Sequence, residues 1–307
     1  SIISLAGILF DTNASGYVLN GTGIALTGNV TNNSIFFQTI NMAVTLSNNI
    51  TFVANSADIV VNGVISGTNG LSKSGANFLQ LTAANTYSGG TTINGGTIAI
   101  SNNAAFGTGT VTFASNSTVF ALTSLNVTNA FTITAPVGTF NVGTGLTQTN
   151  TGVISGAGTL AKTAAGTLQL TAANTYSGGT TVNAGTILLS GSGTLGSTSA
   201  ALTIGAGTVD LGGLTRTNGA FTLDTGTLTN GTLNATSYAL TNAGNIYAIL
   251  AGSGALTKSG AGTTTLTNAN TYSGGTTVNA GTLTLSGSGT LGSTSGALTI
   301  AGGTVNL

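Results

Sequence analysis

The amino-acid sequence predicts an all-β protein built as a parallel β-helix, or β-solenoid, and two features carry this prediction. The first is internal repetition, because Asn-Thr-Tyr-Ser-Gly-Gly-Thr occurs three times, at 85–91, 174–180 and 270–276. The second is a strand pattern of short runs rich in Thr, Val, Ile and Leu, each opened by Gly or Asn, as at 166–171 and 281–286. Good helix formers other than Ala and Leu are scarce, and Gly interrupts nearly every window.

Many short strands would also suit a sandwich or a barrel, but the repeats favour the solenoid. Each coil of a solenoid contacts only its neighbours, so similar sequence can recur along it. Equivalent side chains of stacked coils lie about 4.8 Å apart. Like charges repel at that spacing, whereas Thr and Asn can hydrogen-bond along the stack. With coils of roughly 20–25 residues, the chain should form about 12–15 coils.

The repeats also suggest an internal division of a single solenoid spanning residues 1–307. The three heptapeptides are separated by 89 and 96 residues, and Lys73, Lys162 and Lys258 keep the same intervals. We therefore expect repeat units at 26–122, 123–211 and 212–307. Residues 1–25 form an additional segment, interpreted as a cap or a strand that contacts another subunit.

The composition argues against most enzymatic and nucleic-acid functions. Among 307 residues, 3% are charged, with four cations and four carboxylates, and there is no His, Cys or Trp. Acid-base, nucleophilic and metal chemistry therefore lack most of their residues, and we expect no cofactor, no metal and no catalysis. Four cations cannot form the basic surface that nucleic acids require. No run approaches about 18 apolar residues, so no membrane-spanning helix is expected.

The repeat cores resemble a known family. The second unit reads Gly156-Ala-Gly-Thr-Leu-Ala-Lys162, then Gly166-Thr-Leu-Gln-Leu170 and the heptapeptide at 174–180, and the third matches from 252 to 283. This pattern is similar to the autotransporter-associated β-strand repeat, also called the passenger-associated transport repeat. Residues 1–60 scarcely carry it. The resemblance implies a right-handed parallel β-helix in an extracellular or cell-surface bacterial protein, and it supplies no catalytic residues.

Several residues could be interpreted as sites, and for most of them a structural role is favoured. Segments 191–196 and 287–292 match G-x-G-x-x-G, but no βαβ unit surrounds them, so we expect tight corners. The recurrent lysines could bind an anionic glycan or a lipid, and Tyr87, Tyr176 and Tyr272 could form a carbohydrate platform. We expect instead solvated lysines at corners, and packed tyrosines with hydroxyls in water.

The carboxylates offer only a remote enzymatic alternative. Some parallel β-helices cleave polysaccharides, which requires paired carboxylates or a base with a bound cation. The four acids here are Asp11, Asp58, Asp210 and Asp224. Asp210, Arg216 and Asp224 form the densest ionisable group, and an ordinary ion pair is the favoured interpretation. Nine Asn-x-Ser/Thr sequons also occur, among them 126–128 and 234–236, and many of these arise from composition alone.

The preferred function is structural: a secreted solenoid that self-associates head-to-tail into an extracellular filament or surface layer. Leu307 falls midway through a unit, so the last coil should leave an open edge that the N-terminal segment of another copy could cover. Zero net charge removes repulsion between copies. The alternative is a stalk or passenger fragment of an autotransporter-like adhesin, with cell-surface or matrix glycans as partners. The expected subunit contacts are Ile2, Ile3, Leu5, Ile8, Leu9, Phe10, Val305 and Leu307.

Overall fold

The strands pair side by side in parallel, as the sequence predicts. The chain divides into two units, 1–158 and 159–307, and a computed structural model describes residues 2–307 of it. In each unit the chain winds into a β-solenoid, and residues paired between neighbouring coils lie 17–23 positions apart in the sequence. This spacing corresponds to about 15 turns for the two units together. Residues 2–307 contain no helix, and therefore no helix long and apolar enough to cross a membrane. The predicted β-solenoid is confirmed.

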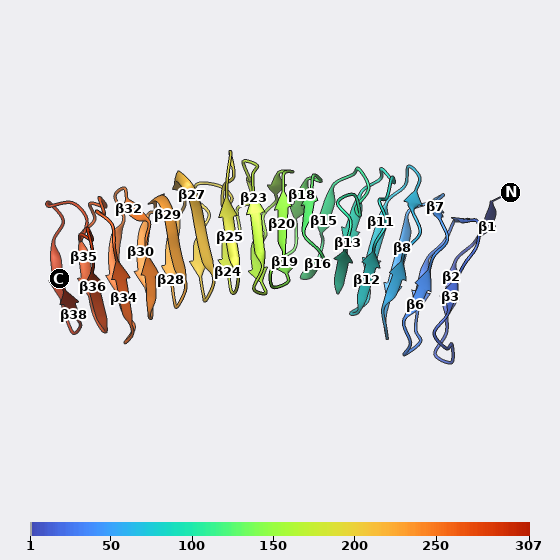
Figure 1. Cartoon of the computed structure of the whole chain (residues 1–307), viewed down its shortest axis with the longest axis horizontal. Helices are drawn as coiled ribbons and strands as arrows, with labels where there is room; N and C mark the ends of the chain where they lie inside the picture. Colours follow the sequence, from blue (N-terminus) through green and yellow to red (C-terminus); the bar gives the residue numbers. More distant parts are fainter. Residues whose placement is uncertain (1) are drawn as a thin grey trace. The chain divides into compact units, whose positions relative to one another are not determined.

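The N-terminal unit (residues 1–158) contains four rows of stacked parallel strands, coloured blue to green in Figure 1. The first row is β1 (Ile3–Leu5), β4 (Ile24–Leu26), β7 (Val44–Leu46) and β10 (Ile65–Ser66). The second is β2 (Ile8–Phe10), β5 (Val30–Asn32), β8 (Ile50–Ala54), β11 (Leu71–Ser74), β13 (Thr91–Ile93), β15 (Val111–Phe113), β18 (Phe131–Ile133) and β21 (Ile154–Ser155). The third is β3 (Val18–Leu19), β6 (Gln38–Ile40), β9 (Ile59–Val61), β12 (Phe78–Leu81), β14 (Thr97–Ile100), β16 (Ser117–Ala121) and β19 (Val137–Val142). The fourth holds β17 (Leu125–Val127) and β20 (Thr147–Asn150).

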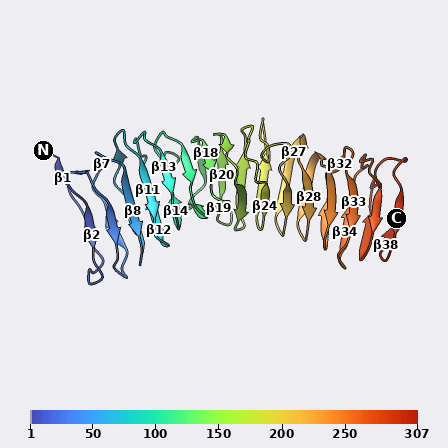
Figure 2. The ribbon, with the colours of Figure 1, turned by 180° about the vertical axis from the view of Figure 1, so that it is seen from behind.

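The C-terminal unit (residues 159–307) contains two main rows, and its parallel stacking is also visible from the opposite side in Figure 2. One row is β22 (Thr159–Thr163), β24 (Thr180–Val182), β26 (Leu202–Ile204), β28 (Ala220–Leu223), β30 (Ser237–Leu240), β33 (Ala255–Lys258), β35 (Thr276–Val278) and β37 (Leu298–Ile300). The other is β23 (Thr167–Leu170), β25 (Thr186–Leu189), β27 (Thr208–Thr217), β29 (Thr227–Asn234), β31 (Gly244–Ile246), β34 (Thr263–Leu266), β36 (Thr282–Leu285) and β38 (Thr304–Asn306). A further strand, β32 (Ile249–Ala251), pairs with β29.

The hydrophobic core lies inside the coils because alternate strand residues point inward. β8 and β16 both show buried residues at the first, third and fifth positions, with partly exposed residues between them. The inward positions carry mostly Ile, Leu, Val and Phe, and the outward positions mostly Thr, Ser or Asn. This period of two is what a strand with one buried face requires.

The longest strands, β27 and β29, show how the coil length changes. Their register shifts between Asp210 and Leu214, so that residues 19 apart pair before the shift and residues 17 apart pair after it. Gly212 and Gly213 lie at this point with φ of 66° and 74°, a left-handed conformation that glycine adopts without strain. The two glycines therefore turn the chain from one face of the coil to the next within a continuous strand.

Candidate functional site

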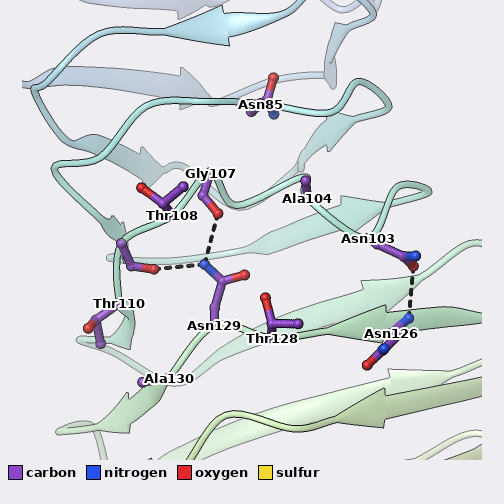
Figure 3. A pocket seen from close by; sticks show the side chains of 11 residues that line it. Asn85, Asn103, Ala104, Gly107, Thr108, Thr110, Asn126, Thr128, Asn129 and Ala130 are labelled. Atoms are coloured by element: carbon purple, nitrogen blue, oxygen red, sulfur yellow. Dashed lines mark hydrogen bonds between the residues drawn. The ribbon is translucent and has the colours of Figure 1, made fainter.

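A polar groove with a volume of about 460 Å³ lies on the N-terminal unit. It lies where the turns after β14 and β17 stack, and Figure 3 shows its side chains. The lining contains only small, neutral residues. They are Asn85, Asn103, Ala104, Gly107, Thr108, Gly109, Thr110, Asn126, Thr128, Asn129 and Ala130.

Asn129 fixes the floor of this groove. Its side chain is 6% exposed, and its Nδ2 donates to the carbonyl oxygens of Gly107 and Gly109 in the preceding coil, at 3.1 and 2.8 Å. In Figure 3 the Oδ1 of Asn129 points away from these carbonyls, on the side of Thr128. Asn85 supports the same wall, because its Nδ2 donates to the carbonyl of Ala105 at 2.6 Å. Buried amides that bridge the backbone in this way hold the turns of successive coils in register.

A second groove, with a volume of about 330 Å³, lies on the C-terminal unit and shares one corner of the repeat with the first. Asn218, 89 residues after Asn129, is 1% exposed and donates from Nδ2 to the carbonyls of Leu195 and Ala200, at 3.2 and 3.3 Å. Its Oδ1 is buried and has no hydrogen-bond partner. The lining is again small and neutral: Thr198, Ser199, Thr217, Asn218, Asn234, Ala235, Thr236, Gly252 and Ser253. Sequence reasoning missed both grooves, although both buried amides follow a Thr at the 89-residue interval.

The three recurrent lysines are buried, which corrects the expectation of solvated corners. Lys73, Lys162 and Lys258 are all 0% exposed. The Nζ of Lys162 donates to the carbonyls of Thr163 and Ala164, both at 2.7 Å, and to that of Ala184 in the next coil at 3.4 Å. Hydrogen bonds to several carbonyl oxygens compensate an ammonium group for its lost hydration, so burial of the charge becomes tolerable.

Lys73 has the same arrangement, and Lys258 has one of its hydrogen bonds. Lys73 Nζ donates to the carbonyls of Ser74 at 2.7 Å, Gly75 at 2.8 Å and Gly95 at 3.3 Å. Lys258 Nζ donates to the carbonyl of Gly260. Burial lowers the pKa of Lys73 and of Lys162 to about 8, and for Lys73 the nearby Asp58 carboxylate opposes this shift. The lysines therefore have no free ammonium group to offer an anionic ligand.

The recurrent tyrosines are also enclosed, including their hydroxyls, which contradicts the expectation of hydroxyls in water. Tyr87, Tyr176 and Tyr272 are 0% exposed. Each hydroxyl lies 2.6–2.7 Å from the hydroxyl of the threonine four residues later, which is Thr91, Thr180 or Thr276. Burial raises the pKa of Tyr272 to about 12 and shifts the pKa of the other two in the same direction. These rings belong to the core and offer no carbohydrate platform.

The G-x-G-x-x-G segments form corners, as predicted. Gly196 and Gly292 have φ of 86° and 85°. A Cβ atom on Gly196 would meet the carbonyl oxygen of Tyr176 at 2.4 Å, and one on Gly292 would meet that of Tyr272 at 2.3 Å. These glycines are therefore required because the turn packs directly against the tyrosine of the preceding coil.

The carboxylates form hydrogen bonds to neutral groups, as Asp210 shows. Residues 2–307 contain no group of three or more His, Cys, Asp or Glu side chains placed to hold a metal ion. Asp210 Oδ1 accepts hydrogen bonds from the backbone of Gly212 and the amide of Asn230, at 2.8 and 2.9 Å. Arg216 donates instead to the carbonyl of Gly191 at 3.2 Å. The expected ion pair between Asp210 and Arg216 is therefore replaced by hydrogen bonds to neutral groups.

Of the residues expected at subunit contacts, all but Ile2 and Leu307 lie in strands that pair within the chain. β1 and β2 pair with β4 and β5, with Ile3 beside Ile24 and Ile8 beside Val30. Among the expected contacts, Ile2, Ile3 and Leu9 are 63–67% exposed, Leu307 is 95% exposed, Leu5, Ile8 and Val305 are partly exposed, and Phe10 is buried. Whether any of them contacts a second copy stays a prediction.

A third surface feature lies on the N-terminal unit, at the turn after β5. Ile35, Phe36 and Phe37 are 76%, 51% and 64% exposed. Buried polar side chains hold this turn from beneath, since Ser34 Oγ accepts from the backbone of Phe36 and Gln38 Nε2 donates to its carbonyl, both at 3.1 Å. Three adjacent large apolar side chains are thus presented to solvent on a fixed backbone, an arrangement typical of interaction surfaces.

Comparison with known proteins agrees with the repeat pattern. The model of the passenger-associated-transport-repeat family matches residues 71–100, 160–189 and 256–285. Each match contains one buried lysine and one buried tyrosine, and begins and ends within paired strands. The chain therefore contains three copies of this repeat, which confirms the predicted resemblance.

A curated relative is the Adhesin BmaC autotransporter of Brucella suis biovar 1 (strain 1330), which is 34% identical over 195 residues. The match covers 62% of this chain and 5% of the relative, so the chain corresponds to a small part of that protein. No solved structure gives a significant match. The chain is thus a β-solenoid that carries three matches to the passenger-associated transport repeat.

Proposed function

We propose that this chain is a non-catalytic segment of a bacterial cell-surface or secreted adhesin. The solenoid is the rigid scaffold that presents the adhesive surfaces. The observation that carries the proposal is the internal use of the repeated polar residues. The lysine and tyrosine of each matched repeat bond to the chain itself. The repeat therefore serves the scaffold, and contacts with other molecules fall to variable residues at turns and outward positions.

Attachment of cells to the purified chain tests this function. Wells coated with increasing amounts of the chain should retain cultured mammalian cells in a saturable manner, and soluble chain should compete. Heat-denatured chain coated at the same density is the control, because an adhesive surface on a rigid scaffold is lost when the fold is lost. Attachment no greater than on uncoated wells would contradict the proposal for this segment.

Self-association into a head-to-tail filament or surface layer is the second candidate. Zero net charge favours it. So does exposed apolar surface, which includes Ile2, Ile3 and Leu9 on one unit and Leu298 and Ile300 on the other, at 46–67% exposure. A second copy of the chain would cover these residues in a heterologous contact.

Electron microscopy and light scattering of the native chain test this candidate. We expect long uniform filaments at neutral pH, and deletion of residues 1–10 should reduce their length or remove them. A chain that remains monomeric at all concentrations, or one whose filaments are unchanged by the deletion, would argue against this role for the N-terminal strands. If the protein stays monomeric and coated wells still retain cells, the result would support the adhesin function and not self-association.

A further inference from the structure

We propose that the two Asn-floored grooves are binding sites for a neutral saccharide, one in each unit. This inference rests on the geometry of the grooves and goes beyond the proposed scaffold function. The saccharide proposal would still stand if wells coated with the isolated chain failed to retain cells. Four observations support it: a corner that the two grooves share, their lining chemistry, an unpaired buried acceptor and the rigidity of the walls.

The two grooves share one corner of the repeat but extend from it in opposite directions, the first mainly over the turns before Asn129 and the second mainly over the turns after Asn218. Asn129 and Asn218 are separated by 89 residues, the interval between the first two heptapeptides, and so are Thr128 and Thr217 at the groove edges. In both units the buried amide bridges two carbonyls of the preceding turn. A buried amide recurs at this corner in both units, which indicates that the corner is a built feature on which each groove borders.

The lining selects for neutral hydroxylated molecules. No charged side chain lines either groove, so a charged ligand would lose hydration without gaining a counter-charge. The exposed side chains of Thr108, Thr110, Thr128 and Asn126 form no hydrogen bonds within residues 2–307, and their hydroxyls and amide can both donate and accept. Sugar hydroxyls are complementary to such groups, whereas an apolar ligand would leave them unpaired.

Asn218 adds a specific acceptor beside the second groove. Its Oδ1 is buried without a partner, and an unpaired buried polar atom costs free energy that a hydrogen bond recovers. Because this atom is closed to solvent, a ligand hydroxyl in the groove would supply the missing donor only if the Asn218 side chain turned toward it.

The walls are fixed before a ligand arrives, which limits the entropy lost on binding. Each wall is a turn held by backbone hydrogen bonds to neighbouring coils, as from Thr108 to Tyr87 at 3.0 Å. The volumes of about 460 and 330 Å³ lie at the lower end of the range of about 300–1,000 Å³ typical of ligand sites. Because no aromatic ring lines either groove, we expect weak binding at each groove, strengthened when a repetitive glycan engages several copies.

Saturation-transfer NMR with the purified full chain tests the proposal. The probes are glucose, galactose, mannose and N-acetylglucosamine, each at about 10 mM, which would fill most sites of a millimolar ligand. The charged analogues glucuronate and glucosamine are measured in parallel. We expect saturation transfer to at least one neutral sugar, and at least fivefold weaker transfer to its charged analogues.

Groove-filling variants assign the signal to the grooves. Thr128→Phe and Thr217→Phe place a ring over each groove without removing its buried amide, and the double variant should reduce the transfer at least fivefold. Thr68→Phe is the matched control, since Thr68 is exposed in another turn and lines neither groove. Unchanged melting curves confirm that the variants fold. No transfer to any neutral sugar, equal transfer to charged sugars, or undiminished transfer in the folded double variant would each overturn the proposal.

Discussion

Two stretches of the chain fill the interior of their coils with different chemistry. Between residues 106 and 140 of the N-terminal unit, three phenylalanine rings cluster around that of Phe131, with ring centroids 5.2–6.1 Å from its own. Between residues 160 and 189 of the C-terminal unit, the interior holds Lys162, whose ammonium group is hydrogen-bonded to backbone carbonyls, and Tyr176, whose hydroxyl is hydrogen-bonded to a threonine. The aromatic stretch lies outside the matched repeats, whereas the polar stretch is one of them.

The difference explains where the repeat is visible in the sequence. Apolar packing tolerates exchange of one hydrophobic residue for another if the volume is kept, so the aromatic coils are free to diverge. A buried ammonium or hydroxyl needs a particular partner at a particular position, because a lost hydrogen bond leaves a buried group unpaired. Lys162 requires the carbonyls at Thr163 and Ala164, and Tyr176 requires Thr180, so these positions recur together. The repeated sequence therefore reflects the hydrogen-bonding requirements of buried polar side chains more than it reflects the fold.

The largest effect is expected when the aromatic cluster is opened. Phe131→Ala removes a fully buried ring that contacts three others, and should lower the free energy of unfolding by about 3–5 kcal/mol. Guanidinium denaturation followed by circular dichroism measures the change. Phe120→Ala is the control, because Phe120 faces outward from β16 and is only partly buried. An equal loss in both variants would mean that the cluster contributes nothing beyond general hydrophobicity.

Removing the charge of Lys162 should lower the free energy of unfolding by a smaller amount. The lysine cage is the set of carbonyl groups of Thr163, Ala164 and Ala184 that bind its ammonium group. Lys162→Met keeps most of the packing but leaves three carbonyls without their donor, and should lower the free energy of unfolding by about 2–3 kcal/mol. Thr203→Met in β26 is the control, since Thr203 faces outward and surface changes usually stay within about 0.5 kcal/mol. A more stable Lys162→Met variant would show that burial of the charge outweighs its hydrogen bonds.

The same lysines predict a modest pH dependence. The folded pKa of Lys73 and Lys162 is lowered to about 8, so the unfolded chain holds more protons between about pH 8 and 10.5. Stability should therefore rise with pH across this window, and fall above about pH 10 as the tyrosines, whose folded pKa values are raised, ionise on unfolding. Below about pH 8 these groups keep their protons in both states, and little change in the melting midpoint is expected.

Melting curves from pH 6 to 11 check the direction. A double Lys73→Met and Lys162→Met variant should lose most of the rise above pH 8 while retaining the fall above pH 10. A rise that persists unchanged in the double variant would assign the effect to other groups.

The smallest expected effect concerns one backbone position in the lysine cage. Ala164 has φ of 59°, a conformation that favours glycine, and the corresponding residues of the other two repeats are Gly75 and Gly260. Ala164→Gly should therefore stabilise the chain by about 0.5–1 kcal/mol, less the extra entropy of the unfolded glycine. Ala172→Gly, at a non-strand position with no positive φ, should instead be neutral or destabilising. A destabilised Ala164→Gly variant would show that the side chain packs favourably enough to offset the strain.

The sequence by itself determined the class of fold, because repetition and a period of two are local patterns that a solenoid translates directly into stacked strands. It also identified the glycine corners at 191–196 and 287–292, since a G-x-G-x-x-G pattern without a helix predicts a turn. It did not determine which polar residues face inward. From the sequence, Lys162 and Tyr176 resemble residues of a surface corner. Most of their hydrogen-bond partners are nearby in the chain, at Thr163, Ala164 and Thr180, and only the stacking of coils on both sides encloses them in the core. The grooves at Asn129 and Asn218 depend in the same way on turns from different coils, whose spacing no single stretch of sequence encodes.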